Sequence, residues 1–351
     1  MKNLNLLIVE DDETQIQAYL DTISQFNKNS AVQIIPNPVK TFEGAEDLLK
    51  SNYYDAAIID LRLASNSLAY EGVELIKSIN GKLRIPLYAV SASLGQIEDI
   101  EQNLLLQKRN RTDSFKTILE ELLDIYNSGI TTLLRPNSFV DNILTKIFWN
   151  HLPFILEEFI KEKKHNPGWD IEKVLLRYIA SHINEYLELN NENNFEPFNS
   201  NEFYIKPSIK ENNVTGQILQ HLEDKSNWII LTPVCDLVLY KNESRPNAPA
   251  KPKAKFITIA HIDELDIVQN GRSMEDKERL KQNSIDFKYH YLPQTILFKG
   301  GFINFQRVQS IPINIINNDF SKELIISYPF KKDIISRFAN YYARQGQPTF
   351  S

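Results

Sequence analysis

The stretch Tyr54-Asp55-Ala56-Ala57-Ile58-Ile59-Asp60-Leu61-Arg62-Leu63 decides how the N-terminal part of this chain folds. Its apolar residues run without alternation for about the length of one strand, and helix-like segments lie on both sides. Such a run is typical of a parallel strand buried on both faces of a sheet. Because parallel strands carry reactive groups at their carboxyl ends, Asp60 is expected at a functional edge.

Two further apolar strands also end in polar residues. Residues 4–9 lead into Glu10-Asp11-Asp12-Glu13, and residues 85–90 stop at Ser91. With helix-length connections between the strands, this pattern predicts an α/β fold with a doubly wound, five-stranded parallel sheet. The other two strands are expected at 31–35 and 104–106, and the helices at 14–26, 42–51, 72–80 and 115–126.

The converging carboxylates predict a cation site. Three carboxylates within ~4 Å repel one another by ~1 to 4 kcal/mol per pair, so a hard divalent cation such as Mg²⁺ is the natural counter-charge. The alternative is that Glu10 to Glu13 only caps the following helix, as acidic residues near a helix N-terminus often do. Asp60 and Ser91 at neighbouring strand ends favour the cation site.

The first 125 or so residues resemble the receiver domain of two-component response regulators. In that resemblance Asp60 is the phosphoacceptor, Ser91 the conserved hydroxyl residue and Lys108, by a looser alignment, the conserved lysine. The resemblance implies that a histidine kinase donates a phosphoryl group to Asp60.

The same resemblance implies Mg²⁺ as cofactor. Its ligands would be Asp11, Asp60, the carbonyl of Arg62 and, through water, Glu10. Asp12 replaces Glu10 in the acidic pair if the register slips by one residue.

Four departures from the receiver pattern concern signal output. The segment between Asp60 and Gly72 is long and lacks the usual proline, and the interval from Ser91 to Lys108 is short, which implies a reduced helix there. Leu105 stands where receivers carry a switching aromatic residue, and no proline follows Lys108. Phosphorylation is therefore better supported than the standard way of reporting it.

Composition limits the classes of function. The chain has 351 residues, enough for two or three domains, and 39 Lys and Arg against 45 Asp and Glu give a net charge of -6. This charge offers no general attraction to nucleic acid. No apolar run approaches the ~20 residues of a membrane span, and the N-terminus leads into a strand rather than a signal peptide. The single cysteine, Cys235, fits a cytoplasmic protein.

The pattern predicts three parts, a receiver domain at 1–128, a helical connector at 135–190 and a mostly β (α+β) domain of unknown role at 200–351. Pro153 must break or kink the first connector helix. A long apolar stripe from Ile171 to Leu187 follows, at the spacing of one helical face. The stripe is read as core, with a dimerisation face as the alternative, so an oligomer through the connector stays open.

In the last part the strands are expected at 228–234, 237–240, 256–260, 295–298, 302–305, 313–316 and 324–327, with a hairpin turn at Gly300-Gly301. Alternation along the first of these puts Cys235 on the apolar side, so a buried structural thiol is favoured over a nucleophile or metal ligand. A metal site of Cys235, His261 and His290 lacks the close spacing of a zinc motif.

Three phrases of the C-terminal half, Thr215-Gly216-Gln217-Ile218-Leu219, residues 232–237 and Tyr289-His290-Tyr291-Leu292-Pro293, resemble the response-receiver proteins of the bacterial anti-phage Detocs system. In that resemblance one receiver protein carries a nucleotide-destroying effector and another buffers the phosphoryl signal. With no glycine-rich phosphate loop or catalytic cluster in the sequence after residue 130, this chain is more similar to the buffering component.

The leading hypothesis is a phosphoacceptor that takes its phosphoryl group from a histidine kinase and modulates an effector protein of the same operon. One alternative is a receiver-controlled enzyme that uses Cys235, Asp236 and a histidine. The other is a transcriptional regulator, for which the only suggestive phrase is the acidic segment 215–225.

Overall fold

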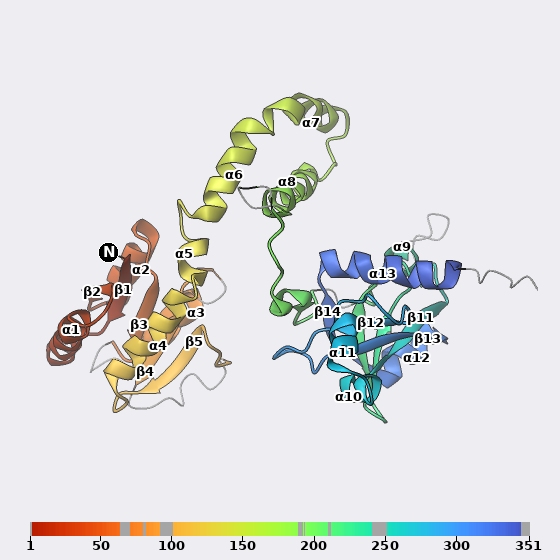
Figure 1. Cartoon of the computed structure of the whole chain (residues 1–351). Helices are drawn as coiled ribbons and strands as arrows, with labels where there is room; N and C mark the ends of the chain where they lie inside the picture. The colour runs from red at the N-terminus through yellow and green to blue at the C-terminus, as the bar shows by residue number, and fades with distance from the viewer. Residues whose placement is uncertain are drawn as a thin grey trace, which may run out of the picture. The chain divides into compact units, whose positions relative to one another are not determined.

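The computed structural model describes residues 2–63, 71–79, 82–91, 101–188, 192, 194–209, 212–240 and 251–344. The chain forms two compact units, residues 1–195 and 196–351 (Figure 1). The finer division into parts at 1–128, 135–190 and 200–351 stays a prediction.

The first unit contains a five-stranded parallel sheet with strand order β2-β1-β3-β4-β5. This is the doubly wound order in which two strands lie on one side of the first and the sequence then continues on the other side. The predicted fold class is confirmed. The strands are β1 (Lys2–Val9), β2 (Val32–Val39), β3 (Ala56–Asp60), β4 (Leu87–Ser91) and β5 (Leu106–Asn110).

Helices cover both faces of this sheet, and each face has its own core. Side chains of β1, β3 and β4 alternate between the two cores, which is why β3 reads as an unbroken apolar run. One face packs against α1 (Glu13–Asn27) and α4 (Phe115–Asn127), and the other against α2 (Phe42–Ser51) and α3 (Glu71–Ile79).

Four more helices complete the described part of the first unit. They are α5 (Ile130–Leu134), α6 (Phe139–Asn150), α7 (Pro153–His165) and α8 (Ile171–Glu188). Pro153 ends one helix and opens the next as its first residue, where the missing N–H has no helical partner to lose. The predicted break at Pro153 is confirmed.

The second unit is built on a seven-stranded antiparallel sheet with the order β12-β13-β11-β8-β7-β14-β6, and a separate pair joins β9 and β10. Its strands are β6 (Tyr204–Ile205), β7 (Gln217–His221), β8 (Asn227–Ile230), β9 (Leu239–Tyr240), β10 (Lys251–Pro252), β11 (Phe256–Asp263), β12 (Tyr289–Leu292), β13 (Gly301–Pro312) and β14 (Phe320–Ile326). The helices are α9 (Val234–Leu237), α10 (Leu265–Gln269), α11 (Met274–Lys281), α12 (Ile313–Asp319) and α13 (Tyr328–Ala343), with a short 3-10 turn, η2 (Ser200–Phe203).

Both faces of the larger sheet are apolar. Ile334 of α13 packs into a core with Ile229 and Ile303, whereas Ile316 of α12 packs on the other face with Ile230 and Ile257. The prediction of a mostly β second part with helical additions is confirmed.

One strand of the first unit was placed wrongly. The prediction for the last strand was 104–106, but β5 starts at Leu106 and ends at Asn110. Leu104 and Leu105 lie exposed in a turn, where the side chain of Asn103 accepts the backbone N–H of Leu105 and Leu106. The reduced helix expected between Ser91 and Lys108 falls mainly on residues 92–100, which lie outside the described residues.

Several strands of the second unit also differ from the prediction. Residues 313–316 begin helix α12 because Pro312 ends the long strand β13, and residues 295–298 belong to the loop between β12 and β13. The hairpin at Gly300-Gly301 exists, but β12 is its first strand. The phrase 215–225 contains β7 rather than a helix-turn-helix, so the transcriptional alternative loses the segment that suggested it.

Cys235 is exposed, so the prediction of a buried thiol was wrong. The predicted strand 228–234 ends early as β8, and Pro233 starts the short helix α9. Alternation along a strand therefore does not apply at Cys235.

A close backbone contact joins helix α3 to the end of β3. A Cβ at Gly72 would lie 2.7 Å from the Cα of Leu61 and closer still to the carbonyl oxygen of Asp60. No residue with a side chain fits there without a shift of α3 or of the strand end.

We expect Gly72→Ala to lower the free energy of unfolding by about 1 to 3 kcal/mol, because the added methyl group overpacks a backbone contact. Gly168→Ala is the matched control, since nothing lies within 4 Å of the Cβ it would add. Urea unfolding of the two variants measures the difference. Equal stability of Gly72→Ala and Gly168→Ala contradicts the prediction.

Candidate functional site

Three carboxylates converge at the carboxyl edge of the parallel sheet. Asp60 is the last residue of β3, and Glu10 and Asp11 follow the neighbouring strand β1, with Val9 opposite Ile59 in the parallel register. One oxygen of each side chain lies within 4.8 Å of the others. Asp60 and Glu10 are buried, whereas Asp11 is half-exposed. In-register parallel pairing is therefore what brings the acidic groups together.

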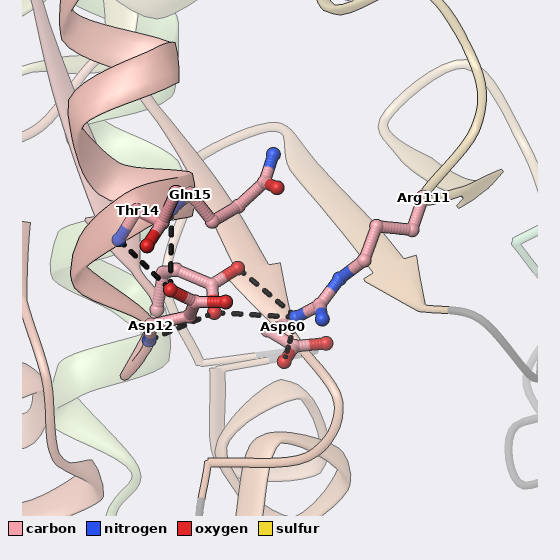
Figure 2. A network of polar contacts seen from close by, with 6 residues as sticks. Asp12, Thr14, Gln15, Asp60 and Arg111 are labelled. Atoms are coloured by element: carbon pink, nitrogen blue, oxygen red, sulfur yellow. Dashed lines mark hydrogen bonds and ion pairs between the residues drawn. The ribbon is translucent and has the colours of Figure 1, made fainter.

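Asp12 has a separate, structural task. Its carboxylate is the N-cap of α1 and accepts the backbone N–H of Thr14 and Gln15 (Figure 2). These hydrogen bonds hold the pKa of Asp12 below its ordinary value. Helix capping thus explains Asp12, while Glu10 and Asp11 remain the pair that lies beside Asp60.

Arg111, just beyond β5, supplies a positive charge to this cluster. Its Nη2 donates to Asp60 Oδ2 at 2.6 Å and lies 3.2 Å from both carboxylate oxygens of Glu10 (Figure 2). Its buried Nε has no hydrogen-bond partner among the described residues. One guanidinium therefore bridges two buried carboxylates, and its Nε–H is still available as a donor.

The raised pKa values of Glu10 and Asp60 show that Arg111 compensates the negative charge of the site only in part. Burial, and then the charge of Asp60, raise the pKa of Glu10 to about 7. Burial also raises the pKa of Asp60, although Arg111 and a backbone hydrogen bond from Arg62 act in the opposite direction. Two buried carboxylates and a third beside them face one guanidinium, so the site favours a further cation.

Ser91 lies on β4, the strand next to β3, and Lys108 lies on β5, one strand further along the sheet. Ser91 ends β4, one residue past the pair Asp60 and Val90, so it lies at the same edge as Asp60 and is nearly buried. Lys108 lies inside β5, opposite Ala89, and the structure records no hydrogen bond or ion pair of this side chain with the described residues. The roles of Ser91 and Lys108 stay predictions.

The donor set of this edge suits Mg²⁺. Glu10, Asp11 and Asp60 offer hard oxygen ligands, and among the described residues they are the one group of three or more acidic, His or Cys side chains close enough to hold a metal. Arg62 follows Asp60 by two residues, so its predicted carbonyl ligand belongs to the same loop.

Arg111 is the residue that the sequence reasoning missed. The signal was present as a cationic run, Lys108-Arg109-Asn110-Arg111, but the start of the strand had been placed too early. Arg109 has a different role, since its guanidinium pairs with Glu121 of α4 at 2.5 Å. Only the register of β5 shows which of Lys108, Arg109 and Arg111 reaches Asp60.

The second unit does not join Cys235, His261 and His290 into a metal site within the part of the chain that the structure describes. His290 is buried, and burial together with Arg337 lowers its pKa to about 3. His261 instead belongs to a polar network around Asp263, which accepts from His261, from Asn304 at 2.7 Å and from Arg307 at 2.5 Å.

Comparisons with known proteins give similarity to solved receiver domains. No protein-family model and no curated protein matches the chain. The N-terminal domain of a response regulator/sensory box/GGDEF 3-domain protein from Carboxydothermus hydrogenoformans is 18% identical, with 36% of this chain and 98% of that chain covered and a TM-score of 0.28.

Two further structures are similar to the same extent. A CheY-like response regulator receiver domain from Methylobacillus flagellatus is 19% identical, with coverages of 34% and 99% and a TM-score of 0.27. The signal receiver domain of an HD domain-containing protein from Pseudomonas fluorescens Pf-5 is 14% identical, with coverages of 36% and 97% and a TM-score of 0.30. The strand order of the first unit and the helices on both faces of its sheet give the doubly wound fold that receiver domains share with flavodoxins.

Among the described helices, none combines the length and the apolar character needed to cross a membrane.

We expect Arg111→Gln to lower the free energy of unfolding by about 1 to 3 kcal/mol in EDTA at pH 8, since the buried carboxylates lose a charged hydrogen-bond donor. Mg²⁺ should recover more stability in this variant than in the wild type, because both cations neutralise the same carboxylates. Urea unfolding with EDTA or Mg²⁺ measures both effects. Arg109→Gln is the control, since it removes an arginine whose partner is Glu121.

The deficit of Arg111→Gln should shrink at pH 5. The pKa of Glu10 is raised from 4.5 to about 7 in the folded protein, so the cost of its buried charge develops as the pH rises through that window. Below it the carboxyl is protonated and needs no counter-charge. An equal deficit at pH 5 and pH 8, or an equal gain from Mg²⁺ in both proteins, contradicts the role given to Arg111.

Proposed function

We propose that this protein accepts a phosphoryl group on Asp60 from a histidine kinase. The supporting observation is one buried carboxylate at the end of the central strand, in contact with Arg111 and beside Glu10 and Asp11. In doubly wound folds, ligands bind beyond the carboxyl ends of the strands, and Asp60 lies at that edge. The kinase and a cytoplasmic location are parts of the proposal.

The proposed transfer needs a nucleophile and neutralised charge. An Asp60 oxygen forms the new P–O bond as the P–N bond of the phosphohistidine breaks, and the imidazole nitrogen leaves with the bonding electrons. Bound Mg²⁺, held by Asp11, Asp60, the Arg62 carbonyl and, through water, Glu10, would supply charge stabilisation for the phosphoryl oxygens.

The cations and hydroxyl around Asp60 would bind the remaining phosphoryl oxygens. Ser91 is proposed to donate its hydroxyl hydrogen, and Lys108 keeps the role that its alignment predicts. Arg111 already contacts Asp60 and has an unused Nε donor, so we add it as a phosphoryl-binding residue. A guanidinium suits phosphate because its donors lie in one plane and can bind two oxygens at once.

Asp60→Asn should abolish phosphorylation by a cognate kinase or a small phosphodonor, because the amide lacks the nucleophilic oxygen pair. Asp11→Asn should reduce the reaction strongly through weaker Mg²⁺ binding, whereas Asp12→Asn should leave it nearly unchanged, since Asp12 caps α1. A phosphate-affinity gel measures the products. If Asp60→Asn is phosphorylated to the wild-type level, the proposed acceptor is wrong.

We further propose that phosphorylation itself is the function, and that this chain buffers signalling in an anti-phage two-component-like system of the Detocs type. The resemblance of the C-terminal phrases motivates this role.

In a reconstituted system of kinase and effector receiver, adding this protein should slow phosphorylation of the effector in proportion to its concentration, because both acceptors draw on one donor. Asp60→Asn should remove the effect. Radiolabelled phosphate on each protein gives the readout. If the wild type accepts phosphate while the effector is phosphorylated at an unchanged rate, the buffering role is wrong even though Asp60 is the acceptor.

A further inference from the structure

Helices α7 and α8 of the first unit are unusually open. Neither buries any residue, although α8 has 18 residues and a long apolar stripe. Helix α4 of the same unit, with 13 residues, buries four. Helices of this length gain most of their stability from packing, so α8 lacks a partner on part of its surface.

One face of α8 already has neighbours in the same chain. Tyr178 contacts the ring of Phe159 from α7, and the hydroxyl of Tyr186 lies 2.9 Å from Nε2 of His151, next to the end of α6. These residues are half-buried. The side of α8 that faces α6 and α7 is therefore accounted for.

A second apolar row lies on another side of α8, and we call it the outer row. It consists of Leu176, Ala180, Ile183 and Leu187, spaced by four, three and four residues. Leu176 is 65% exposed and Leu187 is 59% exposed. Alternating steps of three and four residues are the spacing of a two-helix coiled-coil seam.

Charge along the outer row changes sign from one end of α8 to the other. The first half of α8 holds Lys173 and Arg177, with Glu172 as its only acidic residue, and the second half holds Glu185 and Glu188. A parallel second copy would place like charges opposite one another. An antiparallel copy brings the basic half of each helix against the acidic half of the other.

We propose that the outer row of α8 binds a second copy of this chain, with the two α8 helices antiparallel. The register that packs Leu176 on Leu187 of the other copy also brings Glu188 near Lys173 and Arg177, on the same flank of the row. Ala180, at the middle of the row, allows the helices to approach closely. This inference rests on α8 alone and does not depend on phosphorylation of Asp60.

The outer row is small, so the dimer forms weakly. Stable interfaces bury about 800 Å² on each partner and involve about 20 to 30 residues a side, far more than four side chains. The expected result is a monomer in dilute solution and a dimer at high concentration.

Sedimentation equilibrium of the full chain, from about 1 µM to about 300 µM, should show a rise toward twice the monomer mass. Leu176→Glu should abolish the rise, because it buries a charge in the seam. Leu222→Glu is the matched control, a 48% exposed leucine of the second unit, and should behave as wild type. A monomer at every concentration overturns the proposal, whatever other partner then covers α8.

A charge exchange separates self-pairing from general loss of folding. Arg177→Glu and Glu188→Arg should each weaken the dimer at least 10-fold, by about 1.4 kcal/mol or more. An equimolar mixture of the two variants should restore it, since each mixed pair again has opposite charges. A mixture that stays monomeric, or a Leu176→Glu protein that still dimerises, overturns the proposal.

Cross-linking tests the direction of the helices. In a Cys235→Ser background, which removes the native thiol, Leu176→Cys mixed with Leu187→Cys should give a mixed covalent dimer. Leu176→Cys alone should give little, because antiparallel helices place the two copies of residue 176 far apart. Efficient cross-linking of Leu176→Cys to itself refutes the antiparallel arrangement.

Discussion

The repulsion among three carboxylates is the constraint on which the first unit depends. In-register pairing of β1 with β3 aligns the ends of the two strands, so Glu10, Asp11 and Asp60 come together whenever the sheet forms. The apolar cores on both faces stabilise the sheet and thereby impose the electrostatic cost. Arg111 offsets part of this cost, and the remaining negative charge is what makes the edge suitable for a cation.

Strand pairing and Arg111 together position the carboxylates without the help of a ligand. The guanidinium of Arg111 holds Asp60 and Glu10 in place at hydrogen-bond distance. A divalent cation that enters meets ligands that already converge. The carboxylates need little rearrangement, because Asp60 is the last residue of β3 and Glu10 and Asp11 directly follow β1.

The sequence was informative wherever local pattern and tertiary environment agree. Asp60 and Ser91 end fully apolar strands, so their place at one edge followed from strand ends alone. Arg111 could not be found in this way, since it lies in a polar segment past an edge strand whose apolar content is a single buried leucine, Leu106. A shift in the assumed start of β5 was enough to hide the counter-ion.

The second unit was harder to predict, because the local sequence pattern again does not reveal the tertiary environment. A short, mostly apolar segment such as 313–316 fits a buried strand or a buried helix equally well. The structure resolves that ambiguity through long-range pairing, which a single sequence does not display. Cys235 became exposed because Pro233 turned the chain two residues earlier.

The contact between Gly72 and the backbone of Asp60 has a consequence for the recognition of related proteins. Position 72 has no room for any side chain while β3 ends where it does, so the glycine records the path of the backbone at Asp60. A related chain that keeps the aspartate but has a larger residue here must route its strand end differently. This one position therefore distinguishes sequences that share the site's backbone from those that share only its carboxylates.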